Sequence, residues 1–207
     1  MESTAPSMRN LTRRKTVLGV GINDATFITS FTDSEGNKYI HPAYSDWNNM
    51  MKRCYSDFFQ SSYPTYHGCK VNEDWFSFMS FYRFWQEYHV EGYQLDKDIL
   101  WINNKEYSSE KCVYVPNHIN SFFGEKTKDN GLPVGVHVFK RDNNYRACIR
   151  KNGKSYHVGY FANPDDANRA WSIEKKVHLH SIKSELDEID PRLYECMMIK
   201  IDSMTVK

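Results

Sequence analysis

The residues best suited to binding chemistry lie between Val134 and Phe161, at every second position of three short segments. Arginine and histidine can contact phosphates or base edges, a phenyl ring can contact a base, and a serine hydroxyl can donate or accept a hydrogen bond. Side chains along a β-strand point alternately to its two faces. If the segments form one sheet, a single face carries His137, Phe139, Arg146, Arg150, Ser155 and His157, and Arg141 lies in the first turn.

Two turns divide this stretch into three strands that should pair in order as an antiparallel meander. Residues 141–144 supply the first turn, and residues 151–153, which include the strong hairpin signal Asn-Gly, supply the second. The positions between the polar ones are mostly apolar: Val136, Val138, Tyr145, Ala147, Ile149, Tyr156 and Val158. Residues 134–161 contain six Lys or Arg against one Asp. The sequence therefore predicts a sheet with one apolar face and one basic face.

The apolar face needs a cover, and residues 163–179 predict a helix that provides one. Asn163 or Asp165 can cap it, Pro164 suits an early helical position, and apolar residues recur at helical spacing. Ala167 and Ala170 are small, so the helix can lie close to the sheet.

This stretch resembles the three-strand-and-helix DNA-binding domain of plant ethylene-response factors, the APETALA type, which is also found inserted in phage homing endonucleases. The resemblance covers residues 134–181 and rests on Gly135-Val136, Tyr145-Arg146-Ala147, Gly153-Lys154, Val158-Gly159-Tyr160-Phe161, Asp166-Ala167 and Ala170-Trp171. It implies that the sheet lies in the major groove of double-stranded DNA, with the basic face toward the bases. His137, Cys148, Ser155 and His157 stand where the family has charged residues or tryptophan. The alternatives are a merely solvated sheet face and a protein-binding module.

A second set of chemically capable residues begins with Asp96-Lys97-Asp98. The chain around it, residues 40–123, resembles phage proteins of the HNH endonuclease superfamily. The matching residues are Trp47, Met50, Arg53-Cys54, Tyr66, Gly68-Cys69, Glu73, Trp75, Phe78, Phe81, Gly92-Tyr93 and Leu95-Asp96-Lys97-Asp98.

In that superfamily, two strands and a helix hold one divalent metal ion, which neutralises charge on the scissile phosphate while a histidine activates water. The resemblance implies that Asp96 is a metal ligand, whereas Lys97 stands where the base histidine is expected and Lys111 where a metal-binding asparagine is expected. His118 and Asn120 can restore a base and an oxygen ligand, and Asp98 can complete the site. Oxygen ligands favour Mg²⁺. The predicted catalytic residues are Asp96, Lys97, Asp98 and His118, and the predicted metal ligands are Asp96 and Asn120.

Each of these residues also has a plainer interpretation. Asp96-Lys97-Asp98 can be an ordinary charged turn, and a histidine near a helix start is often a cap or a surface residue. A zinc site is less favoured, because its candidate ligands contain no Cys-X-X-Cys pair: Cys54, His67, Cys69, Cys112 and His118. Cysteines packed as free thiols in the core are the simpler interpretation.

The composition is that of a globular protein, with 207 residues, 40% hydrophobic and 26% charged, and a formal net charge of +1. The five cysteines are odd in number and widely spread, which favours a reducing cytoplasm over a disulfide scaffold. No signal peptide or apolar run of membrane-spanning length is visible, so we expect a soluble intracellular protein with no membrane partner. If it is phage-encoded, the compartment is the cytoplasm of the bacterial host.

The fold class predicted from sequence is α+β, in five parts. Residues 1–16 form a flexible basic arm, 17–123 a helix-rich HNH-like module, 124–133 a linker, 134–181 the sheet-and-helix domain, and 182–207 a helical tail broken near Asp190-Pro191. Within the HNH-like module we expect a strand at 17–22 and one helix from Glu73 to Tyr88. The resulting hypothesis is a metal-dependent DNA endonuclease with a separate DNA-reading sheet, and its alternative is a non-cleaving DNA-binding protein that acts by occupancy or on a host protein.

Overall fold

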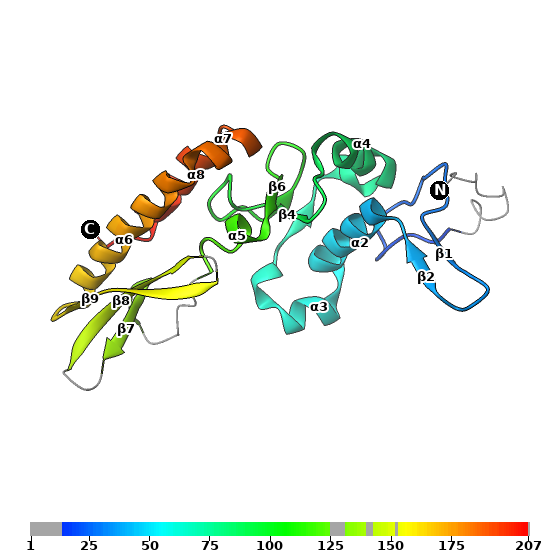
Figure 1. Cartoon of the computed structure of the whole chain (residues 1–207). Coiled ribbons are helices and arrows are strands. Elements are labelled where there is room, and N and C mark those ends of the chain that lie inside the picture. Colours follow the sequence, from blue (N-terminus) through cyan, green and yellow to red (C-terminus); the bar gives the residue numbers. More distant parts are fainter. Residues whose placement is uncertain (1–13, 125–130, 140–142, 152, 207) are drawn as a thin grey trace. The chain divides into compact units, whose positions relative to one another are not determined.

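The computed structural model describes residues 14–124, 131–139, 143–151 and 153–206, and it has the mixed α+β architecture expected from the sequence (Figure 1). Contacts between residues divide the chain into two compact units. The N-terminal unit comprises Met1–Glu91 and Asn103–Cys112, and the C-terminal unit comprises Gly92–Ile102 and Val113–Lys207. Residues 92–102 and 113–123, which the sequence analysis assigned to the first module, therefore make their contacts with the C-terminal part of the chain.

The N-terminal unit is a helical assembly around a cluster of aromatic side chains. Its elements are β1 (Ser30–Thr32), β2 (Lys38–Ile40), α2 (Pro42–Tyr55), α3 (Asp57–Ser62), η1 (Pro64–Tyr66), β3 (Lys70–Val71), η2 (Glu73–Phe76), α4 (Phe78–Tyr88) and β5 (Glu106–Tyr107). β1 pairs with β2 in an antiparallel hairpin, and β3 pairs with β5 in parallel. Trp47 of α2 and Phe78 of α4 are fully buried, and the Trp47 indole donates a 2.8 Å hydrogen bond to the Trp75 carbonyl.

The helix expected from Glu73 to Tyr88 is wrong as a single element, because the chain leaves the helical conformation at Ser77. Ile22 binds on both sides of this break: its N–H donates to the Phe76 carbonyl, and its carbonyl accepts from the Phe78 N–H. The Ser77 hydroxyl caps α4 at the Ser80 N–H and donates to Asp24. Helical periodicity alone does not show a break that is stabilised by residues about 50 positions earlier.

Two expectations at the start of the chain are also corrected. Residues 17–22 form a tight turn rather than a strand, with Leu18 and Gly19 at positive φ and paired hydrogen bonds between Val17 and Gly21. Arg14, placed in the flexible arm, donates to the carbonyls of Asn23, Ala25 and Phe27 at 2.8, 2.7 and 3.2 Å. Residues 1–13 of the predicted arm and 125–130 of the predicted linker lie outside the described residues.

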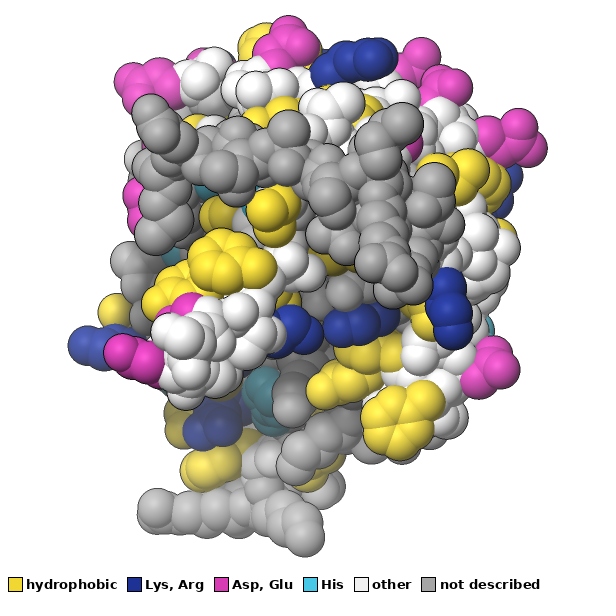
Figure 2. Space-filling model, turned by 90° about the vertical axis from the view of Figure 1, so that its right-hand side faces the viewer, with side chains coloured by type: hydrophobic (Ala, Val, Ile, Leu, Met, Phe, Trp, Pro, Cys, Tyr) yellow, Lys and Arg dark blue, Asp and Glu magenta, His cyan; other side chains and the backbone are white. Residues whose placement is uncertain are grey.

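Some hydrophobic side chains of the N-terminal unit remain exposed. Phe31 and Tyr39 stack at 4.9 Å across the β1–β2 hairpin and keep 46% and 42% of their surface accessible. Figure 2 shows a surface on which hydrophobic side chains stand exposed among charged ones.

The C-terminal unit combines a two-stranded antiparallel sheet, a three-stranded antiparallel sheet and four helices among its described residues. Its elements are β4 (Tyr93–Asp96), β6 (Val113–Pro116), α5 (Asn117–Asn120), β7 (Val136–Phe139), β8 (Asn144–Lys151), β9 (Lys154–Phe161), α6 (Pro164–Ser181), α7 (Lys183–Ile189) and α8 (Leu193–Ser203). β4 pairs with β6, and the larger sheet has the order β7-β8-β9. The break between α7 and α8 falls at Asp190-Pro191, as predicted.

Helix α6 covers one face of the β7-β8-β9 sheet and contacts all three strands (Figure 1). It begins as the sequence predicts, with the Asn163 side chain accepting from the Asp165 N–H at 2.8 Å and Pro164 in the first helical position. Gly135, just before β7, lies close against α6: its φ is +76°, and a Cβ there would lie 2.1 Å from the Trp171 ring. On the covered face Ala147 and Ile149 are buried, whereas Val138 and Tyr156 at its margins remain 52% and 48% exposed.

The core of the C-terminal unit extends from α6 to the last helix. Trp171, Leu179, Leu186, Met197 and Ile201 are fully buried in one cluster. The buried Asn168 amide donates to the carbonyls of Val134 and Met204 and accepts from the Val206 N–H, so its polar atoms are satisfied. The predicted tail is therefore part of this unit. No helix among the described residues has the length and apolar character needed to cross a membrane.

Candidate nucleic-acid interface

The sheet face opposite α6 carries the polar residues that the sequence analysis grouped together. Residues paired across neighbouring strands share a face, and the register pairs His137 with Arg146, Phe139 with Asn144, Cys148 with His157 and Arg150 with Ser155. We call this surface the open face, formed by His137, Phe139, Asn144, Arg146, Cys148, Arg150, Ser155, His157 and Tyr160. The set contains two arginines, two histidines and no acidic residue. Arg141 lies outside the described residues.

Aromatic rings form a row along the open face. The Tyr160 ring lies between those of Phe139 and His157, with centroid separations of 4.7 and 4.4 Å. Tyr160 is half exposed and pairs with Arg146 on the neighbouring strand. The row thus places flat apolar surface next to a guanidinium group.

The sequence analysis missed Tyr160 because of a β-bulge. Ala147 pairs with Gly159 but Cys148 pairs with His157, so Val158 is an extra residue in β9. Beyond the bulge the alternation is reversed, which places Tyr160 on the open face and Phe161 against the core. The isolated Gly159 inside a strand pattern is the signal that could have shown the bulge, since such glycines often mark one.

Arg146 and Arg150 lie at alternate positions of β8 but are held differently. The Arg150 Nε donates to the Gly153 carbonyl at 3.3 Å, which draws its guanidinium toward the hairpin turn. Arg146, on the same central strand of the sheet, is flanked by His137 on β7 and Tyr160 on β9. Arg146 is therefore the central basic residue of the open face.

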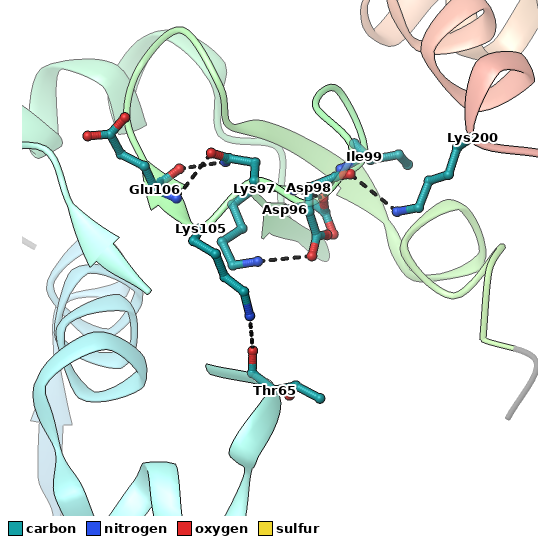
Figure 3. A network of polar contacts seen from close by, with 9 residues as sticks. Thr65, Asp96, Lys97, Asp98, Ile99, Lys105, Glu106 and Lys200 are labelled. Atoms are coloured by element: carbon teal, nitrogen blue, oxygen red, sulfur yellow. Dashed lines mark hydrogen bonds and ion pairs between the residues drawn. The ribbon is translucent and has the colours of Figure 1, made fainter. Parts of the chain in front are cut away.

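The Asp96–Asp98 turn, residues 96–98, uses its polar groups to stabilise itself (Figure 3). The Asp96 Oδ1 accepts hydrogen bonds from the backbone N–H groups of Asp98 and Ile99 at 2.9 and 2.7 Å. Burial and the neighbouring Asp98 charge raise the pKa of Asp96. Asp96 thus acts as a local cap, as in the plainer interpretation of the sequence.

Lys97, although predicted to replace a catalytic base, is buried, and its ammonium forms a 2.9 Å ion pair with Asp98. Burial alone would raise the pKa of Asp98, but the ion pair with Lys97 outweighs it, so the pKa lies below its usual value. The Lys200 ammonium of α8 donates to the Asp98 carbonyl at 3.2 Å, as Figure 3 shows. This turn is therefore tied to the last helix.

His118 and Asn120 are also engaged elsewhere. The His118 Nε2 lies 2.8 Å from the Glu185 Oε1 on α7, and the Asn120 amide donates to Gln94 on β4. Of the residues the structure describes, no three His, Cys, Asp or Glu side chains form a group able to hold a metal ion. The side chains predicted to hold Mg²⁺ each have a partner within the protein: Asp96 accepts from two backbone N–H groups, Asp98 is paired with Lys97, and the Asn120 amide nitrogen donates to Gln94.

The cysteines are free thiols, and four of them are buried. Among the candidates for the alternative zinc site, Cys54, Cys69 and Cys112 belong to the N-terminal unit, whereas His118 belongs to the C-terminal unit. In the same N-terminal unit Lys111, which stands where a metal-binding asparagine was expected, forms an ion pair with Glu106. That pair lowers the pKa of Glu106.

Comparisons of the chain with protein-family models, with curated proteins and with solved structures found no match.

Proposed function

We propose that the protein binds double-stranded DNA through the open face of its β7-β8-β9 sheet. The observation that carries the proposal is the register, which gathers arginine, histidine, serine and aromatic side chains on the face that α6 leaves uncovered. The major groove is about 12 Å wide and admits a β-ribbon. A face of this composition suits both phosphate contact and base contact.

Arg146 is the residue on which the proposal depends most. From the central strand of the sheet it can form a bidentate contact with guanine, and the neighbouring Phe139–Tyr160 pair offers apolar surface for a thymine methyl group. Histidine and serine beside it add hydrogen-bonding groups. Arg146 should thus contribute to sequence discrimination as well as to affinity.

The test begins by selecting duplexes that the full chain binds from a random-sequence pool. The affinity of a selected and an unselected duplex is then measured for the parent, Arg146→Ala and Arg169→Ala. Arg169 is a matched control, because it is a half-exposed arginine on α6 that pairs with Asp166. We expect Arg146→Ala to weaken the binding free energy for the selected duplex by about 1–3 kcal/mol, and Arg169→Ala to weaken it by at most about 0.5 kcal/mol. If Arg146→Ala binds the selected duplex as tightly as the parent, the open face is not the surface that contacts DNA.

Hydrolysis of DNA is the second candidate function. The observation in its favour is the order of two antiparallel strands, β4 and β6, followed directly by helix α5, as the HNH resemblance implies. Incubation of duplex DNA with the protein and Mg²⁺ or Mn²⁺, against the same mixture with chelator, distinguishes the two functions. Chelator-sensitive cleavage that Asp96→Ala abolishes supports the endonuclease, and binding without cleavage supports occupancy alone. The variant Lys97→His tests whether the lack of a histidine base at this position limits the rate of DNA cleavage.

A further inference from the structure

A cleft in the C-terminal unit lies among α5, the end of the β8–β9 hairpin and the junction of α6 with α7. Its volume is about 980 Å³, and its lining is mixed, with polar and apolar surface in similar amounts. Asn117 and His118 come from α5, Arg150 and Tyr156 from the hairpin, and Glu185 from α7. Of the open-face residues, only Arg150 also lines the cleft, so the cleft is a separate site.

The walls of this cleft are fixed by contacts beneath them. Lys175 of α6 is fully buried and donates to the Phe122 carbonyl just beyond α5, and the Phe122 ring stacks on His178 at 5.1 Å. The His118–Glu185 contact joins α5 to α7. These contacts link all the helical walls, so the cleft is already formed before any ligand arrives.

The charges at the cleft favour an anion on its hairpin side. Arg150 and Lys151 both line the cleft. The Lys151 ammonium is ion-paired with Glu174 at 2.9 Å, whereas the 3.3 Å bond to the Gly153 carbonyl holds the Arg150 guanidinium at the turn, so Arg150 carries the positive charge of this side. Arginine matches the geometry of phosphate oxygens. The acidic Glu185 lies on the helical side and is bound to His118, where its carboxylate can accept from sugar hydroxyls.

Tyr156 adds an aromatic surface to the same cleft. Its side chain is 48% exposed although it lies on the side of the sheet that α6 covers. A tyrosine ring can stack on any base, because every base has a flat π-face. The volume exceeds what a single phosphate needs and lies in the range of small-molecule sites, about 300–1,000 Å³.

We propose that this cleft binds a nucleotide, with the phosphate at Arg150, the base on Tyr156, and the sugar toward Glu185. The nucleotide is either free in solution or the terminal residue of a nucleic-acid strand. The cleft shares only Arg150 with the open face, so the proposal stands independently of DNA binding through Arg146.

Calorimetric titration of the full chain with adenosine 5′-monophosphate, inorganic phosphate and a short 5′-phosphorylated single strand tests the proposal. We expect the mononucleotide to bind at least tenfold more tightly than inorganic phosphate. Arg150→Ala should weaken mononucleotide binding about tenfold or more, and Tyr156→Ala about fivefold or more. The matched control Arg146→Ala, on the same strand but outside the cleft, should change the affinity for the mononucleotide less than twofold. Tighter binding of the single strand than of the mononucleotide identifies a strand end as the source, and the reverse order identifies a free nucleotide.

Ser121→Trp provides a variant that blocks the cleft without changing its charge. Ser121 is exposed and lines the cleft, so an indole there should abolish mononucleotide binding while circular dichroism shows an unchanged fold. No binding of the mononucleotide at millimolar concentration by the parent would overturn the proposal. Equal binding by the parent, Arg150→Ala and Ser121→Trp would also overturn it. Loss of DNA binding in Arg146→Ala with mononucleotide binding retained separates this site from the open face.

Discussion

The open face and the Asp96–Asp98 turn both gather residues whose side chains are capable of binding chemistry, but the two regions use them in opposite ways. In the turn, Asp96 binds two backbone N–H groups and Lys97 binds Asp98, so the polar groups hold the local structure together. On the open face, Arg146, His157 and Tyr160 stand on the side of the sheet that α6 does not cover. The difference teaches that residue type indicates what a side chain can bind, whereas its local partners decide whether it binds the protein itself.

Neighbouring residues of β9 provide the strongest test of this contrast. Phe161 packs against the core, so Phe161→Ala should lower the free energy of unfolding by about 2–4 kcal/mol. Tyr160→Ala should change it by less than about 1 kcal/mol but weaken binding to duplex DNA. Denaturant unfolding and fluorescence anisotropy measure the two quantities. The reverse assignment of effects would show that the bulge at Val158 is misplaced.

Asp96→Ala tests the structural side of the comparison. Two backbone N–H groups lose their acceptor, so we expect the free energy of unfolding to fall by about 1–3 kcal/mol while DNA affinity is retained. Asp96→Asn keeps an acceptor oxygen, so its free energy of unfolding should fall less than that of Asp96→Ala. If Asp96→Ala is as stable as the parent, the carboxylate is not a structural cap.

The salt dependence of DNA binding tests the binding side. Each neutralised phosphate releases counterions, so the logarithm of the binding constant falls linearly with the logarithm of salt concentration. If Arg146 contacts a phosphate, Arg146→Ala should reduce this slope by about 1, and if it contacts a base the slope changes less and sequence discrimination falls. Arg169→Ala should leave both unchanged. Equal slopes and equal discrimination in all three proteins would contradict any DNA contact by Arg146.

The smallest expected effect concerns pH and the Glu106–Lys111 pair. Hydrogen bonding to Lys111 lowers the pKa of Glu106 in the folded protein, so the unfolded chain takes up the proton first as the pH falls. The pair therefore stabilises the fold above about pH 4.3, the unfolded value for glutamate, and this contribution is lost as the pH falls through the folded pKa. Glu106→Gln should lower the free energy of unfolding by at most about 1 kcal/mol at pH 7. The free energies of unfolding of the parent and of Glu106→Gln should converge as the pH is lowered from 7 to 3. A difference that stays constant over this range would contradict a stabilising Glu106–Lys111 pair.

The sequence predicted the parts of the fold that local signals determine. The cap at Asn163, the pairing of Lys151 with Lys154 on the two sides of the second turn, and the alternation along β8 each depend on residues close together in the chain, and the structure confirms them. The break at Ser77 and the Lys200 bond to Asp98 depend on residues far apart in sequence. Helical and strand periodicity carry no information about such partners.

The candidate sites show the same division. The register of the sheet places the predicted basic and polar residues that are described on one face, because their side-chain pattern has the period of a strand. His118 binds Glu185, and Asn120 binds Gln94. No spacing in the sequence indicates either partner. Motif positions alone therefore do not show which partner each of these side chains has in the fold.

The contact between Gly135 and Trp171 sets a limit on how the sheet-and-helix part of the chain can vary. With φ at +76° and a Cβ position 2.1 Å from a fully buried indole, position 135 admits only a hydrogen atom as its side chain. Gly153 has nearly the same φ, +75°, but open space around it, so asparagine is an acceptable replacement there. In a library that randomises both positions, selection for folding should return glycine alone at 135 and a mixture of glycine and asparagine at 153.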